Sequence, residues 1–569
     1  MNPRDELIRI QKRLLRRLRK EIRHIVRENT PLLVKYREEY EREVAHYARV
    51  ATQRELVERV ADSDIVYCGD YHTLAQAQRT PVKILQQVLA RSRRKVVLCI
   101  EAVLARCQAY LDDYMAGRLS EKEFLKKIDY EHTWSFVWEH YGVLLDFARE
   151  HGLRVVGINS EPEGIRGRLE ARDRVAAEII VAETERDPSA LLFVLDGDWH
   201  VSSTHLPAQV EKILREKGLT RRRLIIFQNS EKIYWRLAAR RMEHKVDVVQ
   251  IAKDKYCVLN TTPVVKLRTY LNWVEEVEEL GYAALWRNEA PHAVMEDELL
   301  QIMNTVADFI GLPREGLDEF SVYSVADLDF LEALVRRRHF TEPEVREIKR
   351  QIERDESYYL PRGHIIYLSN LSLNHAAEEA THFINHLCAG EFAGPETPRD
   401  AFYQKVVAEA LGFLGSKIVN QKRTCYRERD FREFLREKRG RFEGGRGGEL
   451  SVLRKVARFV LSHRGYERRV FRTGRRTSPP RAVFRQEPDV LYAVVHSLGY
   501  LLGNSLYYGL IWNRVDKSFV RSLFFENFKE RRPFDVYMEV SLLLQGVRIF
   551  NIIKGEACDD LGEEVDLDA

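Results

Sequence analysis

Six short apolar runs, separated by stretches of helix length, constrain the fold of this chain more than any other feature of its sequence. Strands that are apolar throughout are buried on both faces, which is typical of a parallel sheet covered by helices. The sequence therefore predicts an α/β domain with a mostly parallel sheet flanked by helices. The runs are 65–68, 96–100, 155–158, 191–195, 224–227 and 256–259.

The first 60 residues contain no glycine and repeat apolar side chains at helical spacing, with arginine and lysine between them. This pattern predicts a long basic amphipathic helix that precedes the sheet. We expect it to be a packing or dimerising arm, so a homo-oligomer formed through it is one expectation; contact with an anionic membrane or nucleic acid is the alternative. The apolar positions are Leu7, Ile10, Leu14, Leu18, Ile22 and Ile25.

Beyond about Trp286 the apolar runs become rare and helical periodicity dominates. Two segments of this part, 409–415 and 496–503, look alike and suggest a duplicated helix with close glycine packing. We therefore expect three parts along the chain. They are a helical arm at 1–54, an α/β domain at 55–290, and a mostly α-helical domain at 291–569.

The formal net charge of +4 is small for 569 residues, so the whole chain shows no electrostatic preference for nucleic acid. A basic segment at 421–486 interleaves arginine with phenylalanine, but its apolar side chains also repeat as in a helix core, and we do not expect a nucleic-acid partner. The seven cysteines form no Cys-x-x-Cys pair, and neither a secretory signal nor a run of membrane-spanning length is visible. These features predict a cytoplasmic protein with reduced thiols.

Polar side chains follow four of the predicted strands at the point where each strand ends. Gly69 to His72 follow the first strand, Glu101 the second, an Asn-Ser-Glu segment at 159–161 the third, and Asp-Gly-Asp-Trp-His at 196–200 the fourth. In parallel sheets the loops at the carboxyl ends of the strands converge and bind ligands. The sequence therefore predicts one polar site at this edge of the sheet.

Two histidines with several carboxylates allow more than one chemistry. They can bind a divalent ion such as Mn, Fe or Zn and lower the pKa of a bound water, or act without a metal as general base and acid. A buried polar network that only caps helices is the remaining interpretation. The candidate metal ligands are His72, Glu101, Glu161, Asp198 and His200.

The two Gly-x-x-His motifs, Gly69 to His72 and Gly197 to His200, with Glu101 between them, resemble the ChaN-like haem-binding proteins of the Tiki superfamily. The resemblance covers residues 55–290, whereas the C-terminal half resembles no family that we know. Three further pieces fit the order and spacing of the family: the helix at 134–141, the strand ending at Asn159 and the Arg-Asp segment at 172–174.

The superfamily joins ChaN, described as an iron-regulated haem binder, with Tiki-type metal-dependent peptidases, TraB-like proteins and erythromycin-esterase-like hydrolases. The resemblance therefore implies a site more firmly than an activity. Asp70 stands where the family often has the longer glutamate, which puts the catalytic reach of that carboxylate in doubt. Because no signal peptide is visible, we expect an intracellular role rather than haem uptake at an outer surface. The implied catalytic residues are His72, Glu101, His200 and Arg172.

For haem, the chain must offer an axial ligand beside an apolar slot and cations for the propionates. Trp134, Trp138 and Trp199 are the candidate apolar walls, and Arg172 is an alternative cation to Arg174. The candidate haem-binding residues are Tyr71, His72, Tyr141, His200 and Arg174.

Three hypotheses follow from the resemblance and the residues. The first is a ChaN-like protein that binds haem or another iron ligand. The second is a metal-dependent hydrolase of a small molecule or peptide that uses the same histidines and acids. The third is a scaffold without catalytic activity.

A second candidate site lies in the helical half. His375, Glu379, His382 and His386 are spaced by four, three and four residues, so on a helix they share one face. The Glu-x-x-His spacing within them is used by di-metal sites in helical bundles. A solvated polar face or a helix interface explains the same pattern. The candidate ligands are His375, Glu379, His382 and Glu409.

Overall fold

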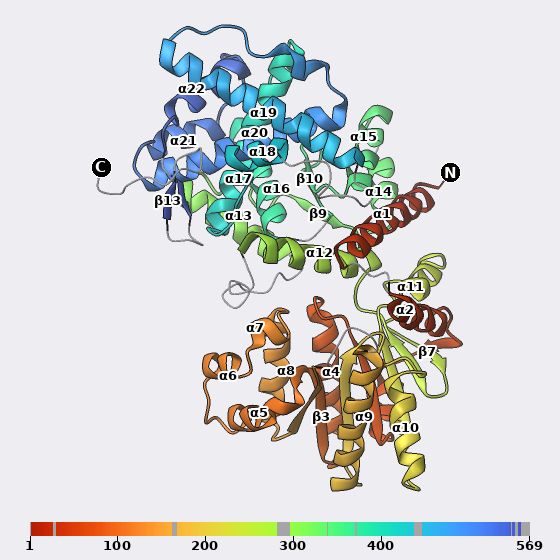
Figure 1. Ribbon diagram of the computed structural model, residues 1–569. Coiled ribbons are helices and arrows are strands. Elements are labelled where there is room, and N and C mark those ends of the chain that lie inside the picture. Colours follow the sequence, from red (N-terminus) through yellow and green to blue (C-terminus); the bar gives the residue numbers. More distant parts are fainter. Residues whose placement is uncertain are drawn as a thin grey trace. The chain divides into compact units, whose positions relative to one another are not determined.

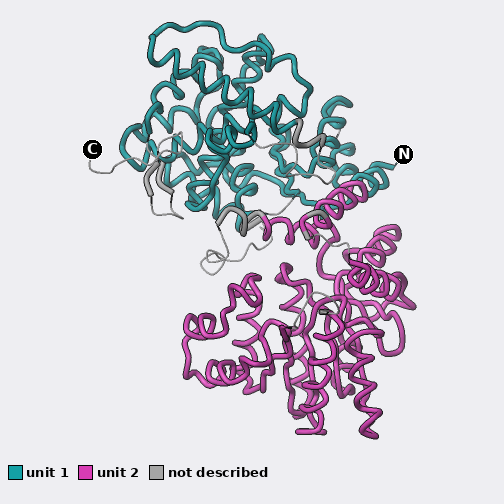
Figure 2. Tube along the Cα trace, in the orientation of Figure 1, with its two compact units in different colours: residues 1–10, 291–569 teal, residues 11–290 magenta. Residues whose placement is uncertain are grey.

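The computed structural model describes residues 2–26, 30–161, 168–280, 296–337, 340–369, 372–436, 447–547, 549–551 and 556–558. These residues form two compact units (Figure 2), which we call the α/β unit (residues 11–290) and the helical unit (residues 1–10 and 291–569). The division falls inside the first helix, α1 (Pro3–Val26). The expected three-part division at residues 54 and 290 stays a prediction.

The α/β unit is built on an eight-stranded sheet of order β1-β7-β8-β6-β2-β5-β3-β4 (Figure 1). Six neighbouring strands, from β8 to β4, pair in parallel, whereas β7 pairs antiparallel with both β8 and β1. The predicted α/β class with a mostly parallel sheet is therefore confirmed. The strands are β1 (Arg49–Ala51), β2 (Ile65–Asp70), β3 (Val96–Leu104), β4 (Arg154–Asn159), β5 (Leu191–Gly197), β6 (Arg223–Gln228), β7 (Val248–Ala252) and β8 (Lys255–Val258).

Helices cover both faces of this sheet, because alternate strand residues point to opposite faces. Val66 and Cys68 of β2 pack into one core with α3, α4, α5 and α8, whereas Ile65 and Tyr67 pack into the other with α9, α10 and α11. The helices of this unit are α2 (Pro31–Glu43), α3 (Gln53–Ala61), α4 (Ala75–Leu89), α5 (Gln108–Met115), α6 (Glu121–Lys127), α7 (Tyr130–Thr133), α8 (Trp138–Glu150), α9 (Arg168–Arg186), α10 (Leu206–Glu216), α11 (Glu231–Ala238) and α12 (Pro263–Leu280), with a 3-10 turn at Ala105–Cys107.

The N-terminal segment is less uniform than its periodicity suggests. The predicted basic helix corresponds to α1, in which Leu7, Ile10, Leu14 and Leu18 are buried. A second helix, α2, then begins at Pro31, where the Thr30 side chain caps the first turn. Residues 49–51 form an edge strand of the sheet rather than helix.

The helical unit packs its core from α13, α16, α17, α19, α20, α21 and α22. Its two look-alike segments lie on α17 and α20, which approach so closely that a Cβ atom on Gly503 would lie 2.4 Å from the Ala410 carbonyl oxygen. Its elements are α13 (Glu296–Ile310), β9 (Ser321–Ser324), α14 (Phe330–Arg337), α15 (Glu342–Arg354), β10 (Tyr358–Leu360), β11 (Ile365–Leu368), α16 (Leu373–Ala389), α17 (Pro398–Val419), α18 (Glu428–Arg436), α19 (Gly447–Thr473), a 3-10 turn at Arg481–Arg485, α20 (Pro488–Ile511), α21 (Lys517–Phe524), α22 (Pro533–Leu543), β12 (Ile549–Asn551) and β13 (Glu556–Cys558). Within the described part of the chain, no helix is long and apolar enough to span a membrane.

Candidate functional site

The carboxyl ends of β2, β5 and β3 lie side by side, since these strands are neighbours in the parallel sheet. Asp70 at the end of β2 is in register with Gly197 at the end of β5. The backbone N–H of Asp198 donates to the Asp70 carbonyl oxygen at 2.9 Å, so the two loops with the Gly-x-x-His motifs are joined by a main-chain hydrogen bond. The edge predicted from the sequence therefore brings both motifs together.

His72, which is partly exposed, and the buried Asp70 form the first of two acid–histidine pairs. The His72 Nδ1 atom lies 2.9 Å from Asp70 Oδ2, which also accepts a hydrogen bond from the Tyr141 hydroxyl at 2.8 Å. The rings of Trp134 and Phe136 lie 4.7 and 4.8 Å from the His72 ring. Burial alone would lower the pKa of His72, but the Asp70 carboxylate raises it above its usual value.

His200 and Asp173 form the second pair. The His200 Nδ1 atom contacts Asp173 Oδ1, and the Tyr36 hydroxyl donates to Asp173 Oδ2 at 2.8 Å. Burial would lower the pKa of His200, but the carboxylates of Asp196 and Asp173 raise it to about 9. At neutral pH both ring nitrogens of His200 are therefore protonated, and the side chain is positively charged.

Glu101 lies between the two histidines. Its Oε1 atom pairs with Arg172, and its Oε2 atom accepts the backbone N–H of Gly197 at 2.9 Å and lies 3.8 Å from His72 Nε2. Burial raises the pKa of this carboxyl group, but Arg172 and the two histidines outweigh it and lower the pKa to about 2. A Cβ atom on Gly197 would lie 3.4 Å from Glu101 Oε2, which is an ordinary van der Waals distance.

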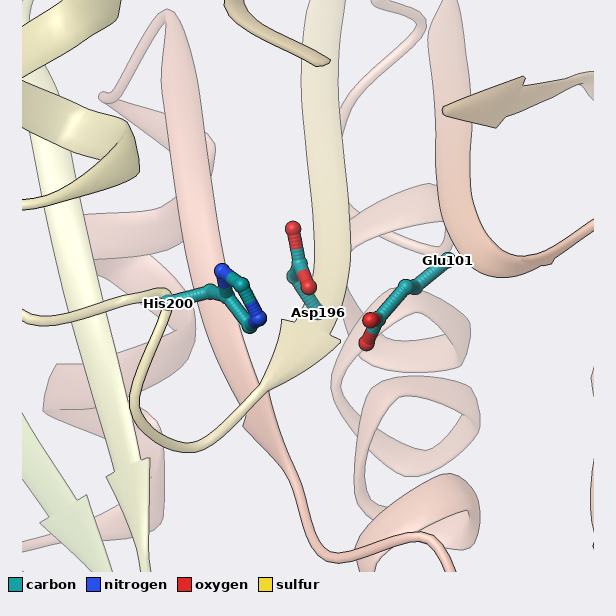
Figure 3. A group of neighbouring side chains, drawn as sticks. All are labelled: Glu101, Asp196 and His200. Atoms are coloured by element: carbon teal, nitrogen blue, oxygen red, sulfur yellow. The ribbon is translucent and has the colours of Figure 1, made fainter. Parts of the chain in front are cut away.

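Asp196 completes a compact group with Glu101 and His200 (Figure 3). One ligand atom from each of the three lies within 4.8 Å of the others, and all three side chains are buried. Burial and the Glu101 carboxylate raise the pKa of Asp196 well above its usual range. A cation would favour its ionised form, so the group has the chemistry of a divalent metal site.

A lysine from α12 neutralises the remaining acid of the site. Lys266 Nζ lies 2.6 Å from Asp198 Oδ2, and the ammonium group lies 4.8 Å from the centre of the Tyr71 ring. Burial raises the pKa of Asp198, and Lys266 opposes that rise. Gln228 supports the loop by donating to the Gly69 carbonyl oxygen at 2.6 Å.

These side chains border a pocket of about 510 Å³ in the α/β unit. The predicted site residues Tyr71, His72, Glu101, Arg172, Asp198 and His200 line it, as does Trp199. Tyr141 and Trp138 do not line the pocket. The Tyr141 hydroxyl donates a hydrogen bond to Asp70, and the Trp138 ring packs against Tyr114, Phe124 and Tyr130.

Like Tyr141, the predicted residues Glu161 and Arg174 do not line the pocket. Glu161 is exposed and pairs with Arg106 at 2.9 Å. Arg174 is exposed on α9, two residues beyond Arg172. Since one helical residue turns the side chain by about 100°, Asp173 rather than Arg174 faces inward here.

Four residues of the site were not among the predicted ligands. Asp173 and Asp196 lie next to predicted positions, so local sequence offered a signal for them. Lys266 and Tyr36 come from α12 and α2, and neither belongs to a motif that would have identified it.

The second predicted cluster lies in the helical unit. His375, Glu379, His382 and Glu409 all line one pocket of about 490 Å³. In the part of the chain that the structure describes, the only three His, Cys, Asp or Glu side chains whose ligand atoms lie within 4.8 Å of one another are Glu101, Asp196 and His200. The helical cluster is therefore more open than a preformed metal site.

Residues 56–167 match the family model described as "Haem-binding uptake, Tiki superfamily, ChaN". This match spans 112 of the 569 residues and confirms the resemblance of the α/β unit over that stretch. Two solved structures are similar to the chain. The first, described as cofacial haem binding to ChaN of Campylobacter jejuni, is 11% identical to this chain. The match covers 32% of this chain and 86% of that chain, with a TM-score of 0.24.

The type III effector HopBA1 is the other, at 15% identity over 38% of this chain and 98% of that chain, with a TM-score of 0.27. Likenesses this weak support no conclusion about function. No curated protein matches the sequence.

Proposed function

We propose that the α/β unit binds haem in the pocket over the carboxyl ends of β2, β3 and β5. The observation that carries the proposal is the setting of His72, which Asp70 holds at Nδ1 while two aromatic rings flank it and 25% of its side chain is exposed. The family match, whose description names haem-binding uptake, includes this histidine.

The His72 side chain is suited to be an axial ligand of haem iron. A histidine that binds a metal through one ring nitrogen commonly donates its other N–H to a carboxylate, as His72 does to Asp70 at 2.9 Å. His200 fits this role less well, because its side chain is only 9% exposed and its pKa of about 9 keeps both ring nitrogens protonated. Tyr71 remains a second candidate ligand, since it also lines the pocket.

The other residues that line the pocket suit the porphyrin ring and the propionates of a haem. Its volume of about 510 Å³ falls within the range of small-molecule and cofactor sites. Arg23 and Arg37 line the pocket and offer cations for the propionates. When bound, haem would supply an iron centre for ligand exchange or electron transfer. The apolar lining residues include Ile22, Leu33, Phe136, Leu169, Trp199 and Leu267.

Titration of the full-length chain with haemin, followed by Soret absorption, tests this proposal. We expect saturable binding that weakens by about tenfold or more in His72→Ala, and by a smaller factor in Asp70→Asn, which only loosens the ring. His132→Ala is the matched control, because His132 is exposed and pairs only locally with Asp129. No saturable binding, or equal binding by His72→Ala, would sink the proposal.

Metal-dependent hydrolysis of a small molecule or peptide is the second candidate. It is favoured by Glu101, Asp196 and His200, whose ligand atoms lie within 4.8 Å of one another. An ion held there would supply Lewis acidity. His72, oriented by Asp70, would act as the general base beside it.

Elemental analysis of the purified chain, together with ester and peptide substrate panels, separates the two candidates. A non-haem metal that is lost in Asp196→Asn, with metal-stimulated hydrolysis, would support the hydrolase and replace the haem proposal. If alanine at both His72 and His200 changes neither bound ligand nor activity, the unit is a scaffold instead.

A further inference from the structure

The pocket of the helical unit is lined by more acidic than basic side chains. Residues of α15, β10, α16, α17 and α20 contribute to its lining, and its volume is about 490 Å³. Seven lining residues are aspartate or glutamate, whereas two are lysine or arginine. A pocket of this size and charge favours a small organic cation over an anion. The acids are Glu347, Asp355, Glu356, Glu378, Glu379, Glu409 and Glu526.

Two histidines of this pocket have one ring nitrogen fixed by a carboxylate. His496 Nδ1 lies 2.9 Å from Glu409 Oε2, and His375 Nδ1 lies 3.2 Å from Glu378 Oε2. A proton on Nδ1 leaves the lone pair on Nε2. Within the described residues no hydrogen bond engages either Nε2 atom, so both are available to a ligand. Burial would lower the pKa of His496, but the Glu409 carboxylate raises it, which favours a donor at its Nε2 atom, whereas His375 can offer an acceptor.

Buried oxygen atoms of the lining that have no hydrogen-bond partner among the described residues include the hydroxyls of Tyr358 and Tyr359, and Glu356 Oε2. Tyr358 is 5% exposed. Burial raises the pKa of Glu356 to about 7, although Arg354 and His496 oppose the rise. Buried polar atoms without partners are costly, so a ligand that donates hydrogen bonds here would be stabilised.

Aromatic rings form part of the same wall. Tyr359, Tyr492, Phe392 and Phe528 line the pocket with Tyr358. Rings of this kind attract a cation over their faces and cover the apolar part of an amine-bearing molecule. Acid and aromatic side chains together are the lining that a protonated amine requires.

A bare metal ion fits this pocket less well. The predicted ligand His382 uses both ring nitrogens, with Nδ1 3.1 Å from Glu379 Oε2 and Nε2 3.2 Å from the Ala408 carbonyl oxygen. It therefore joins α16 to α17 beside Gly412, where a Cβ atom would lie 2.5 Å from Nε2. The remaining donor atoms are spread around a cavity rather than drawn together.

We propose that the helical unit binds a small molecule carrying a protonated amine in this pocket. Glu356 and the Tyr358 hydroxyl receive the ammonium group, and the Nε2 atom of His375 accepts a further hydrogen bond. The aromatic rings cover the carbon skeleton. This site is independent of the haem pocket and uses none of its residues.

Calorimetric titration of the full-length chain with a panel of amines, from ethylamine to glucosamine and spermidine, tests the proposal. We expect saturable binding of at least one amine. Glu356→Gln should weaken it about tenfold or more, because it replaces the carboxylate that pairs with the ammonium group by a neutral amide. Tyr358→Phe should weaken binding less. Glu342→Gln, at a side chain that is 92% exposed, should bind as wild type.

Two outcomes would overturn the proposal. In one, no amine of the panel binds saturably, or Glu356→Gln binds it as well as wild type does. In the other, Zn²⁺ binds and is lost in His496→Gln while no amine binds, which would make the pocket a metal site. His72→Ala should bind amines as wild type does, so failure of the haem proposal leaves this test unaffected.

Discussion

Replacing Asp173 with asparagine tests whether His200 is charged in the folded chain. Asp173 accepts hydrogen bonds from the Tyr36 hydroxyl at 2.8 Å and from His200 Nδ1, and both Asp173 and His200 are buried. Burial lowers the pKa of His200, but the carboxylates of Asp196 and Asp173 raise it from 6.5 to about 9. Asparagine keeps the shape of the aspartate and one acceptor oxygen but carries no charge.

The size of the effect depends on pH in a defined direction. A histidine whose pKa is higher in the folded than in the unfolded chain contributes stability that is complete below pH 6.5 and is lost as pH rises through about 9. Against the effect of burial, Asp196 and Asp173 together produce the rise to about 9, which is worth about 3 kcal/mol. Asp173→Asn removes its share of this rise and also breaks a buried charged pair, whose loss typically costs about 3–5 kcal/mol. We therefore expect the free energy of unfolding to fall by about 3 kcal/mol near pH 6 and by about 1 kcal/mol near pH 10, where only a neutral hydrogen bond is lost.

Calorimetric unfolding of the full-length chain measures this difference. One kcal/mol shifts Tm by about 2–4 °C in a domain of about 150–250 residues, so the expected drop is about 6–12 °C near pH 6 and about 2–4 °C near pH 10. Asp146→Asn, at a side chain that is 59% exposed, is the control and should leave Tm unchanged. An equal drop at both pH values would refute a charged His200.

Two further predictions concern buried contacts. Lys266→Met leaves Asp198 without the cation that lies 2.6 Å away, so it should lower the free energy of unfolding by about 3 kcal/mol at pH 8. That loss should shrink on acidification, because the pKa of Asp198 is already raised and the carboxylate then binds a proton; a loss that grows in acid contradicts the reasoning. Gly503→Ala places a methyl group 2.4 Å from the Ala410 carbonyl oxygen and should cost about 1–3 kcal/mol in urea unfolding. Gly465 also lies in a helix, but a Cβ atom there would have no atom within 4 Å, so Gly465→Ala should stabilise the folded chain by up to about 1 kcal/mol. A similar loss of stability in both variants would show that close packing is not the cause.

Short apolar runs made the parallel strands predictable, because strands buried on both faces leave a continuous signal. All six predicted runs correspond to strands, from β2 to β8. The two strands of this sheet that were not predicted are β1, at the edge, and β7 beside it. Both are short, and they carry exposed or half-buried residues such as Arg49 and Gln250. A strand of three residues beside charged neighbours carries too little periodicity to be distinguished from a helix.

The candidate site was predictable where its residues follow strands and not where they come from distant helices. His72 and His200 follow the ends of β2 and β5, and Glu101 lies in β3 just after the last residue that pairs with β5. The parallel topology brings these positions together. Lys266 reaches the site from α12, 68 residues beyond its partner Asp198. Only the tertiary packing of that helix determines the contact, so no local pattern could reveal it.

The main-chain hydrogen bond from Asp198 to Asp70, at 2.9 Å, couples the backbone of the two histidine loops. Each histidine stands two residues beyond one of these two backbone positions, so a shift of one strand end that keeps this bond also moves the other. A substitution that displaces either strand end should therefore change the positions of both histidines, and the site should respond as one unit.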